Sequence, residues 1–435
     1  MHEVPFPGEP HAIEEDTLVR PSLLFASLMA AVCTLIAPLT PPAELDAAGA
    51  QPGSQPLHFH AGTSARDIPF RYEFGHIILP VLVADSLVID MMLDSGFGVN
   101  GAILLDPAIG QALHLHYSGQ TPLGGGGTSG QMFADVATNA TLSVPGVTFS
   151  GQTLLVVTDA EPYRNFPARG IIGKTLFDCT VEIDYETSRL HLHDADTYRP
   201  PDGCTSLETT FTYGIPVVQA TLAAEGAADV PVKLIVDTGA VQLLLFPWTS
   251  AGIQLPERLV TARERILSKG FNGIVLGSSG RIPRLHLGPY TLNNVVTSFP
   301  DSATWGSALV LGQDGMLGND ELRHFVVAFD YAHQRIHLKP NARFAEPFET
   351  DMSGMMWEPT PEGWLTVVDV IPDSPATESG IETGDLIVAI DGRSPAEWGW
   401  PALEALFMRE GARARLTIER GKERLERALT TRRLI

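Results

Sequence analysis

The chain has 435 residues, of which 44% are hydrophobic and 18% are charged, so it holds enough apolar side chains to fill several domain cores. Its formal net charge of −22 argues against nucleic acid as a partner, because phosphate binding requires clustered Lys and Arg. The same acidity favours a soluble, monomeric protein.

The N-terminal segment predicts export. The apolar run 22–37 follows a polar, acidic leader. It is shorter than the about 20 residues of a bilayer span and closer to the about 7 to 15 of a signal-peptide core. Ala48-Gly49-Ala50 offers a cleavage site. We therefore expect residues 1–69 to be an export signal and linker, and the protein to be periplasmic, envelope-associated or secreted. An uncleaved membrane anchor is the alternative, and a misassigned start codon would explain the acidic leader.

The first strands of the folded part lead to an acidic turn. Alternation of Val81 and Val83, then of Leu87 and Ile89, predicts two strands joined by a turn. The second strand ends at Asp94-Ser95-Gly96, where glycine permits a tight bend. One such tripeptide is usually an ordinary turn, because Asp and Gly are favoured turn residues.

A second copy of this pattern follows, and its surroundings repeat as well. Asp237-Thr238-Gly239 also closes an apolar strand. Two further pairs have nearly the same separation: Gly170-Ile171-Ile172-Gly173 with Gly315-Met316-Leu317-Gly318, and Asp184-Tyr185 with Asp330-Tyr331. Before each acid another pair matches, Leu79-Pro80-Val81 with Ile215-Pro216-Val217. The two halves are therefore copies of one module.

This duplicated Asp-Thr/Ser-Gly, with an apolar-apolar-Gly motif after each copy, resembles the retropepsin-like and pepsin-like aspartic proteases. The resemblance implies a mainly β fold with two pseudo-symmetric β-barrel lobes in one chain, at about 70–203 and 204–345. It implies an endopeptidase in which Asp94 and Asp237 form a catalytic dyad that activates water against a peptide or protein substrate. Ser95, Gly96, Thr238 and Gly239 would support the active-site loops.

One residue departs from the family pattern. Lobe two keeps a small Ala240 after the glycine, whereas lobe one has Phe97. A bulky ring beside the dyad would narrow the cleft, change specificity or mark a lobe that no longer serves catalysis. The alternative to an enzyme is thus a catalytically inactive peptide-binding or scaffold protein that retains the fold.

Two glycine-rich segments match the flaps that close over substrate in this family. Consecutive glycines suit a loop that must move and bring its backbone to a peptide, although a plain flexible loop is the alternative. The flap residues by this resemblance are Gly124, Gly125, Gly126 and Gly127 in lobe one and Gly273 and Gly277 in lobe two.

No second chemistry competes with the dyad. His191, His193 and His337 lack the spacing of a zinc motif, so neither a metal nor a cofactor is expected. Asp184 and Asp330 are interpreted as structural turn residues. Cys179 and Cys204 form either one disulfide or two buried thiols.

Residues 346–435 have a different character. The series Ser374-Pro375-Ala376, Gly384-Asp385-Leu386-Ile387 and Ile390-Asp391-Gly392 resembles a bacterial PDZ domain. Such domains bind extended peptides by strand addition, often with the terminal carboxylate in a backbone nest. The resemblance assigns peptide binding to Gly354, Met355, Met356 and Trp357, for a substrate, a partner or a C-terminal peptide ligand. A packing module that binds nothing, or an assembly factor without proteolysis, are the alternatives.

Overall fold

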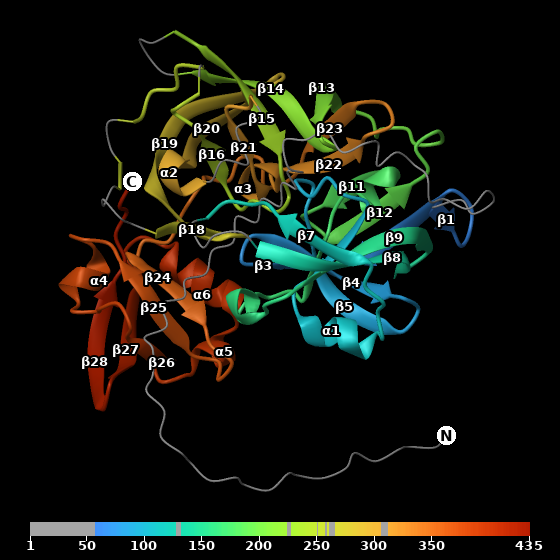
Figure 1. Cartoon of the computed structure of the whole chain (residues 1–435). Coiled ribbons are helices and arrows are strands. Elements are labelled where there is room, and N and C mark those ends of the chain that lie inside the picture. The colour runs from blue at the N-terminus through green and yellow to red at the C-terminus, as the bar shows by residue number, and fades with distance from the viewer. Residues whose placement is uncertain are drawn as a thin grey trace, which may run out of the picture.

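The computed structural model describes residues 57–127, 132–223, 228–249, 251–256, 259–260, 266–305 and 312–435. The apolar run of the expected export signal or anchor lies outside these residues. The described chain is mainly β and forms two lobes and a smaller C-terminal domain, which confirms the predicted fold class (Figure 1). In the part of the chain that the structure describes, no helix has the length and apolar character needed to cross a membrane.

Lobe one is built on a sheet of order β1-β9-β6-β10-β5-β4-β8-β7, with β3 paired to β4. The helix α1 (Pro107–Ala112) packs on it, and Asp106 caps this helix through the Ala108 N–H. The strands are β1 (Leu57–Phe59), β3 (Arg71–Glu73), β4 (His76–Val83), β5 (Leu87–Leu93), β6 (Gly101–Leu104), β7 (Gly119–Leu123), β8 (Met132–Val144), β9 (Val147–Val157) and β10 (Gly170–Ile172).

Lobe two repeats this arrangement, and its sheet continues into the strands that join the lobes, of which β2, β11 and β12 come from the first half of the chain. Its short helices are α2 (Ser302–Trp305) and α3 (Asn319–Leu322). The strands are β2 (Ser64–Pro69), β11 (Thr180–Asp184), β12 (Arg189–His193), β13 (Thr205–Thr212), β14 (Ile215–Ala223), β15 (Val230–Val236), β16 (Leu243–Leu245), β17 (Leu259–Val260), β18 (Ile266–Gly270), β19 (Gly273–Leu287), β20 (Tyr290–Pro300), β21 (Gly315–Leu317), β22 (Phe325–Asp330) and β23 (Arg335–Pro340).

Strand pairing shows that the two lobes share one topology. In lobe one, β10 runs parallel to β5 and antiparallel to β6, and β6 runs parallel to β9. In lobe two, β21 runs parallel to β15 and antiparallel to β16, and β16 runs parallel to β20. The apolar-apolar-Gly motifs thus lie beside the strands that carry the acids, in both lobes. Their apolar residues are buried because strands in the middle of a lobe are covered on both faces.

A sheet of order β2-β12-β11-β22-β23-β13 connects the lobes. Its central pair, β11 and β22, comes from equivalent positions of the two halves and is antiparallel. Strand β2 pairs with β12 as β13 pairs with β23, and β1 pairs with β9. The folded module therefore begins before Phe70, and residues 57–69 are part of the protease fold rather than of a linker, because their backbone groups complete these sheets.

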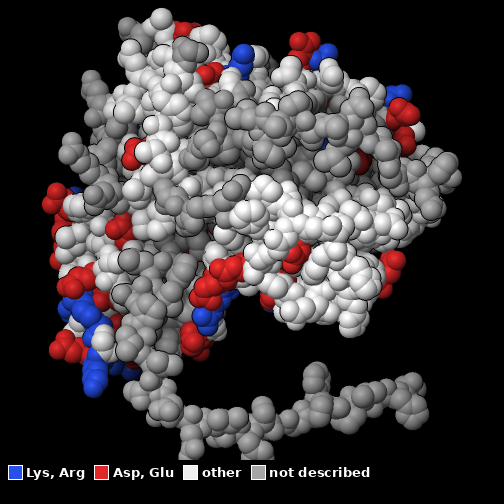
Figure 2. All heavy atoms as spheres, in the orientation of Figure 1, with Lys and Arg blue, Asp and Glu red and all other residues white. Residues whose placement is uncertain are grey.

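The C-terminal domain has a sheet of order β24-β25-β26-β27-β28 and three helices. Acidic and basic side chains lie next to one another along it on the face shown in Figure 2. Leu403 and Phe407 of its longest helix are buried against the sheet, and Leu406 packs beside them. The elements are β24 (Met355–Pro359), β25 (Leu365–Val370), α4 (Pro375–Glu378), β26 (Leu386–Ile390), α5 (Pro395–Trp398), α6 (Trp400–Phe407), β27 (Arg413–Arg420) and β28 (Glu423–Thr430).

Both ends of this domain pack on lobe two. Phe348 and Ile435 are buried in the same apolar core as the lobes. Arg281 of β19 donates to the Phe348 carbonyl at 2.8 Å and to the Ile435 carbonyl at 3.2 Å. On the side of lobe one, Asn165 donates to Glu358 at 3.3 Å. The C-terminal domain is thus fixed against both lobes.

Candidate active site

Asp94 and Asp237 follow β5 and β15 and lie at equivalent places. The Asp94 N–H donates to the Ile172 carbonyl at 2.9 Å, and the Asp237 N–H donates to the Leu317 carbonyl at 3.0 Å. Each acid therefore bonds through its backbone to the apolar-apolar-Gly motif of its own lobe. Both side chains are completely buried. The repeat seen in the sequence brings the two acids together at the centre of the molecule.

Four hydrogen bonds join the two turns. The Ser95 N–H donates to Thr238 Oγ1 at 3.0 Å, and the Thr238 N–H donates to Ser95 Oγ at 2.9 Å. Each hydroxyl then donates across the interface, Ser95 to the Val236 carbonyl at 2.8 Å and Thr238 to the Leu93 carbonyl at 2.9 Å. We call this set the inter-lobe bridge. It fixes the relative position of the two acids.

The glycines of the turns are required by close approach. A Cβ atom at Gly96 would lie 2.7 Å from Asp237 Oδ2, closer than real Cβ contacts allow. At Gly173 a Cβ would lie 2.3 Å from the Phe97 carbonyl oxygen. The Gly239 N–H donates to Asp237 Oδ1 at 2.7 Å. Gly96 therefore lets the backbone approach the Asp237 carboxyl group directly.

The environment favours one proton on the pair. Burial raises the pKa of Asp94 well above its ordinary value, and the charge of Asp237 raises it further. Burial also raises the pKa of Asp237, to about 6, against the opposing effect of the Gly239 N–H. Two adjacent buried carboxylates cannot both ionise without strong repulsion. The pair therefore titrates as a unit, and it keeps a proton at pH values where an ordinary aspartate is ionised.

Asn319 supports the second turn, and the sequence reasoning missed it. Its Nδ2 donates to the carbonyls of Thr238 at 2.6 Å and of Gly75 at 2.8 Å. The Tyr185 hydroxyl donates to Asn319 Oδ1 at 2.8 Å. The available signal was its position directly after the repeated Gly318, where lobe one has Lys174. Asn319 thus links the loop beside Asp237 to the β3–β4 turn of lobe one.

The two glycine-rich hairpin tips meet across the lobes. Residues 128–131 of the first hairpin lie outside the described residues. Of the rest, the Gly127 N–H donates to the Thr304 carbonyl at 3.2 Å, and the Gly126 carbonyl accepts from the Asn272 N–H at 2.9 Å. Asn272 Nδ2 also donates to the carbonyls of Leu123 and Gly125, each at 3.4 Å. Gly124 precedes this contact in the same loop.

Gly273 and Gly277, the predicted flap glycines of lobe two, lie in different parts of the β18–β19 hairpin. Gly273 lies at the β18–β19 turn with φ of +106°, a conformation that favours glycine. Gly277 lies inside β19, where it pairs with Pro300, and a Cβ there would lie 2.4 Å from the Phe299 carbonyl oxygen. Gly273 is thus a turn residue, and Gly277 is required by packing within the strand.

Phe97 is completely buried and faces a residue from the opposite lobe. It belongs to an apolar cluster with Ile78, Leu123 and Tyr163 of lobe one and Phe271 of the lobe two hairpin tip. The Phe271 carbonyl accepts a hydrogen bond from the Tyr163 hydroxyl at 3.1 Å. The equivalent residue in lobe two, Ala240, lies in a separate cluster. The cluster that contains Phe97 therefore includes aromatic rings from both lobes, whereas the residue at the equivalent position in lobe two is the small Ala240.

A cavity of about 480 Å³ separates the C-terminal domain from the protease lobes. The predicted peptide-binding residues Gly354, Met355, Met356 and Trp357 line one side, together with Glu404 and Ala405 of α6. Val241 and Gln242, which follow the Asp237 turn, line the other side. The groove between β24 and α6 therefore opens toward the loop that carries Asp237.

Phe74 of the β3–β4 turn lies in this groove. Its ring centroid is 6.3 Å from that of Trp357 and 5.9 Å from that of Trp400. Phe74 has φ of +51°, and the neighbouring Gly75 has φ of +76°. This turn conformation directs an apolar side chain of lobe one between the strand and the helix of the C-terminal domain.

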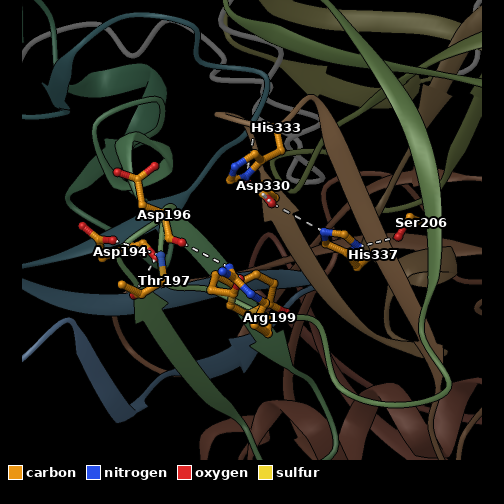
Figure 3. A network of polar contacts seen from close by, with 9 residues as sticks. Asp194, Asp196, Thr197, Arg199, Ser206, Asp330, His333 and His337 are labelled. Carbon is orange, nitrogen blue, oxygen red and sulfur yellow. Dashed lines mark hydrogen bonds and ion pairs between the residues drawn. The ribbon is translucent and has the colours of Figure 1, made fainter.

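The remaining candidate groups have structural roles. Asp184 accepts the N–H groups of Glu186 and Thr187, as a turn residue does. Asp330 contacts His333 and His337, and His337 contacts Ser206 at 2.8 Å, in the network of Figure 3. Burial lowers the pKa of His337. Among the described residues, no group of three His, Cys, Asp or Glu side chains is arranged to hold a metal ion.

The two cysteines of the folded part are free thiols, so they form no disulfide, but only Cys179 is buried and Cys204 is partly exposed. Cys179 is buried, and its thiol donates to the Leu176 carbonyl at 3.1 Å. Burial raises the pKa of Cys179, which keeps this thiol protonated.

A two-lobed β fold with an aspartate at the equivalent turn of each lobe is the architecture of aspartic proteases. Residues 218–320 match a family model described as aspartyl protease, and residues 366–420 match one described as PDZ domain. The chain thus combines an aspartyl protease fold with a C-terminal PDZ domain, as predicted. An aspartic proteinase from Irpex lacteus is a structural neighbour at 12% identity, with 65% of this chain and 99% of that chain covered and a TM-score of 0.39. A search of curated protein sequences gave no significant match.

Proposed function

We propose that this protein is an aspartic endopeptidase in which Asp94 and Asp237 form the catalytic dyad. The observation that carries the proposal is the inter-lobe bridge, because it fixes two buried carboxyl groups from equivalent turns beside each other. An ordinary turn after a strand needs no such reciprocal contact with a second copy of itself. The raised pKa of each acid supports a shared proton.

The proposed mechanism uses the pair as base and acid. The ionised carboxylate takes a proton from a water molecule while that water attacks the peptide carbonyl carbon. The protonated carboxyl group donates to the developing oxyanion. The proton then passes to the leaving nitrogen, so the C–N bond breaks and a new carboxyl and a new amino terminus form. The paired flap tips would open to admit the peptide and close to exclude water.

The C-terminal domain is proposed to bring substrate to this site. Its groove opens into the cavity that Val241 and Gln242 line, so a peptide bound there lies beside the loop of Asp237. Tethering raises the effective concentration of a bound chain even where neither site binds tightly. We further propose that the protein is monomeric and acts outside the cytoplasm, on the basis of its charge and of the apolar run 22–37.

The test is hydrolysis of an unfolded protein by single-residue variants. Asp94→Asn and Asp237→Asn are each expected to reduce cleavage by about 10³-fold or more, because the dyad needs both members. Asp85→Asn, an exposed residue of the β4–β5 turn, is the matched control and should keep full activity. A wild-type level of cleavage in either dyad variant would exclude the assignment. No cleavage by the wild-type chain would favour the peptide-binding scaffold, which the buried Phe97 and Phe271 also fit.

A further inference from the structure

The loop that precedes β24 is the place where a PDZ domain binds a free peptide terminus. Terminal carboxylates are held there by backbone N–H groups that point away from the fold. In this chain the loop contains Asp351, Ser353 and Gly354, and β24 begins at Met355. Of the residues to which the resemblance assigns peptide binding, Gly354 and Met355 lie at this end of β24. Whether a terminus can bind here depends on whether their N–H groups, and that of the preceding Ser353, are available.

Side chains of the loop itself use these donors. The Ser353 N–H donates to Asp351 Oδ1 at 2.7 Å, and the Ser353 hydroxyl donates to the same oxygen. The Met355 N–H donates to Ser353 Oγ at 3.0 Å. Burial raises the pKa of Asp351, and hydrogen bonds from Ser353, from Trp357 and from the Gly354 N–H act against this rise. Asp351 thus takes the place of a ligand carboxylate in the nest.

Asp351 is held there from the other side as well. The indole N–H of Trp357, on β24, donates to Asp351 Oδ2 at 3.2 Å. Both oxygens of the carboxylate are therefore bonded. The side chain is fixed by the strand that would receive the peptide, so it cannot leave without breaking a contact of the groove itself.

The charges around the loop also oppose a terminal carboxylate. Asp351 and Glu404 face the same cavity, from the loop and from α6. Burial raises the pKa of Glu404, and the charges of Asp320 and Asp351 add to this effect, so that the pKa is about 7. Arg323 lines the cavity too, but it pairs with Asp320 at 3.5 Å. A peptide terminus that entered here would bring a further negative charge to two carboxyl groups.

The rest of the groove remains suited to a peptide. Strand β24 is at the edge of its sheet, and among the described strands only β25 pairs with it, so a second strand can add. The apolar surface between Trp357 and Trp400 already contacts the ring of Phe74. Phe74 belongs to a turn in the middle of the chain, so the groove contacts an aromatic side chain from a segment that has no free terminus.

We propose that the groove between β24 and α6 binds internal extended segments of unfolded polypeptide through an aromatic side chain, and that Asp351 excludes free C-termini. The proposal rests on the proposed function, in which this groove supplies the protease. It also explains how a segment bound in the groove could reach the active site. A segment bound by its interior continues beyond both ends of the groove, so it can extend through the cavity toward Val241 and Gln242.

The test measures binding without cleavage, so it remains informative if the dyad proves inactive. Full-length Asp94→Asn protein is titrated against a fluorescein-labelled pool of dodecapeptides that contain Phe and Leu at varied positions. The pool is prepared once with a free C-terminal carboxylate and once amidated, and anisotropy is recorded. We expect the two affinities to differ by less than about twofold. A preference of about tenfold or more for the free carboxylate would overturn the proposal, and so would failure of both pools to bind.

Three variants test whether Asp351 and the groove are responsible for this result. Asp351→Ala frees the N–H groups of Ser353 and Gly354 and should give the free-carboxylate pool an advantage of about fivefold or more. Asp351→Asn keeps an acceptor at Oδ1, so this control should show a smaller preference, and circular dichroism checks that both variants fold. Ala405→Trp, which fills the groove, should remove binding of both pools. Binding that survives Ala405→Trp would place the peptide elsewhere and overturn the proposal.

Discussion

Ser95 and Thr238 each donate their backbone N–H to the hydroxyl of the other, at 3.0 and 2.9 Å. Both residues are buried, and they come from different lobes. Because each hydroxyl also donates to a carbonyl of the opposite lobe, neither turn can shift without losing several bonds at once. The position of the two acids therefore depends on a pair of hydroxyl groups.

Ser95→Ala and Thr238→Ala should each lower the free energy of unfolding by about 1–3 kcal/mol, because a buried N–H loses its acceptor. The kcat should fall as well, since the acids lose their fixed separation. Chemical denaturation and peptide hydrolysis provide the two measurements. Thr238→Ser keeps the hydroxyl and is the matched control. Loss of stability with unchanged kcat would show that the bridge serves folding alone.

The aspartate pair should make stability fall as pH rises. Asp237 has a folded-state pKa of about 6, above its ordinary value of 3.8, so the folded protein holds more protons than the unfolded chain in this window. Its contribution is greatest below pH 3.8 and is lost as pH rises to about 6, and the raised pKa of Asp94 extends the loss upward. Asp237→Asn removes the ionisable group, and with it the free-energy cost of keeping a charged carboxylate buried.

At neutral pH, Asp237→Asn should therefore be more stable than wild type, on the order of 2 kcal/mol, although it is inactive. The difference should shrink as pH falls below about 6, where the folded wild-type acid becomes protonated, and should be smallest below pH 3.8, where the unfolded chain is protonated as well. Thermal unfolding at both pH values measures it, with the exposed Asp85→Asn as control. Equal Tm values for wild type and Asp237→Asn at neutral pH would show that the pair is not destabilised by its charge.

Phe97 should restrict the substrate subsite beside Asp94. Phe97→Ala removes a buried ring from the cluster with Phe271, so we expect kcat/KM to rise about tenfold for peptides with a large side chain at this subsite. The cavity left behind should lower the free energy of unfolding by about 3–5 kcal/mol. A substrate library that varies the residues flanking the cleaved bond measures the change.

Phe325→Ala is the matched control, because Phe325 is equally buried but packs on Tyr290 and Phe344. It should cost similar stability and leave the substrate preference unchanged. If both variants change specificity alike, the effect of Phe97 comes from general loosening of the fold.

A blocked PDZ groove should affect long substrates only. Ala405→Trp places a large ring in the groove, so KM for an unfolded protein should rise, by about tenfold if tethering supplies the local concentration. A short peptide that fills only the cleft should be cleaved as before. Ala402→Trp, an exposed position of α6 that does not line the cavity, is the control. Equal losses on both substrate lengths would indicate a structural role for the domain.

Removal of residues 346–435 is a less direct test of the same idea. Phe348 and Ile435 are buried in the core that the lobes share, and Arg281 bonds to both of their carbonyl groups. The deletion would therefore expose apolar surface of lobe two and remove two carbonyl acceptors of the Arg281 guanidinium, which would keep its bond to Asn294. A loss of activity after deletion would combine the groove with the stability of the lobe.

The sequence alone determined the duplicated module, the two acids, their Ser and Thr neighbours and the PDZ domain. These features are local patterns, in which strand alternation, turn residues and glycines are set by neighbours along the chain. The repeat was decisive, since it distinguished Asp94 and Asp237 from ordinary turn residues. The pairing of β10 with β5 and of β21 with β15 then followed from one topology used twice.

Only the tertiary structure decided which distant groups meet. Nothing near Asn319 in the sequence indicates its bond to Gly75, and nothing near Phe97 indicates that it shares an apolar cluster with Phe271. The position of Phe74 between Trp357 and Trp400 likewise depends on how a whole domain packs on lobe one. The contact of Asp351 with Ser353 and Trp357 could not be predicted from the sequence either. An Asp side chain in a loop can adopt several rotamers, and packing in the folded protein selects one of them. Contacts between residues far apart in the chain are fixed by complementary surfaces, which no local pattern encodes.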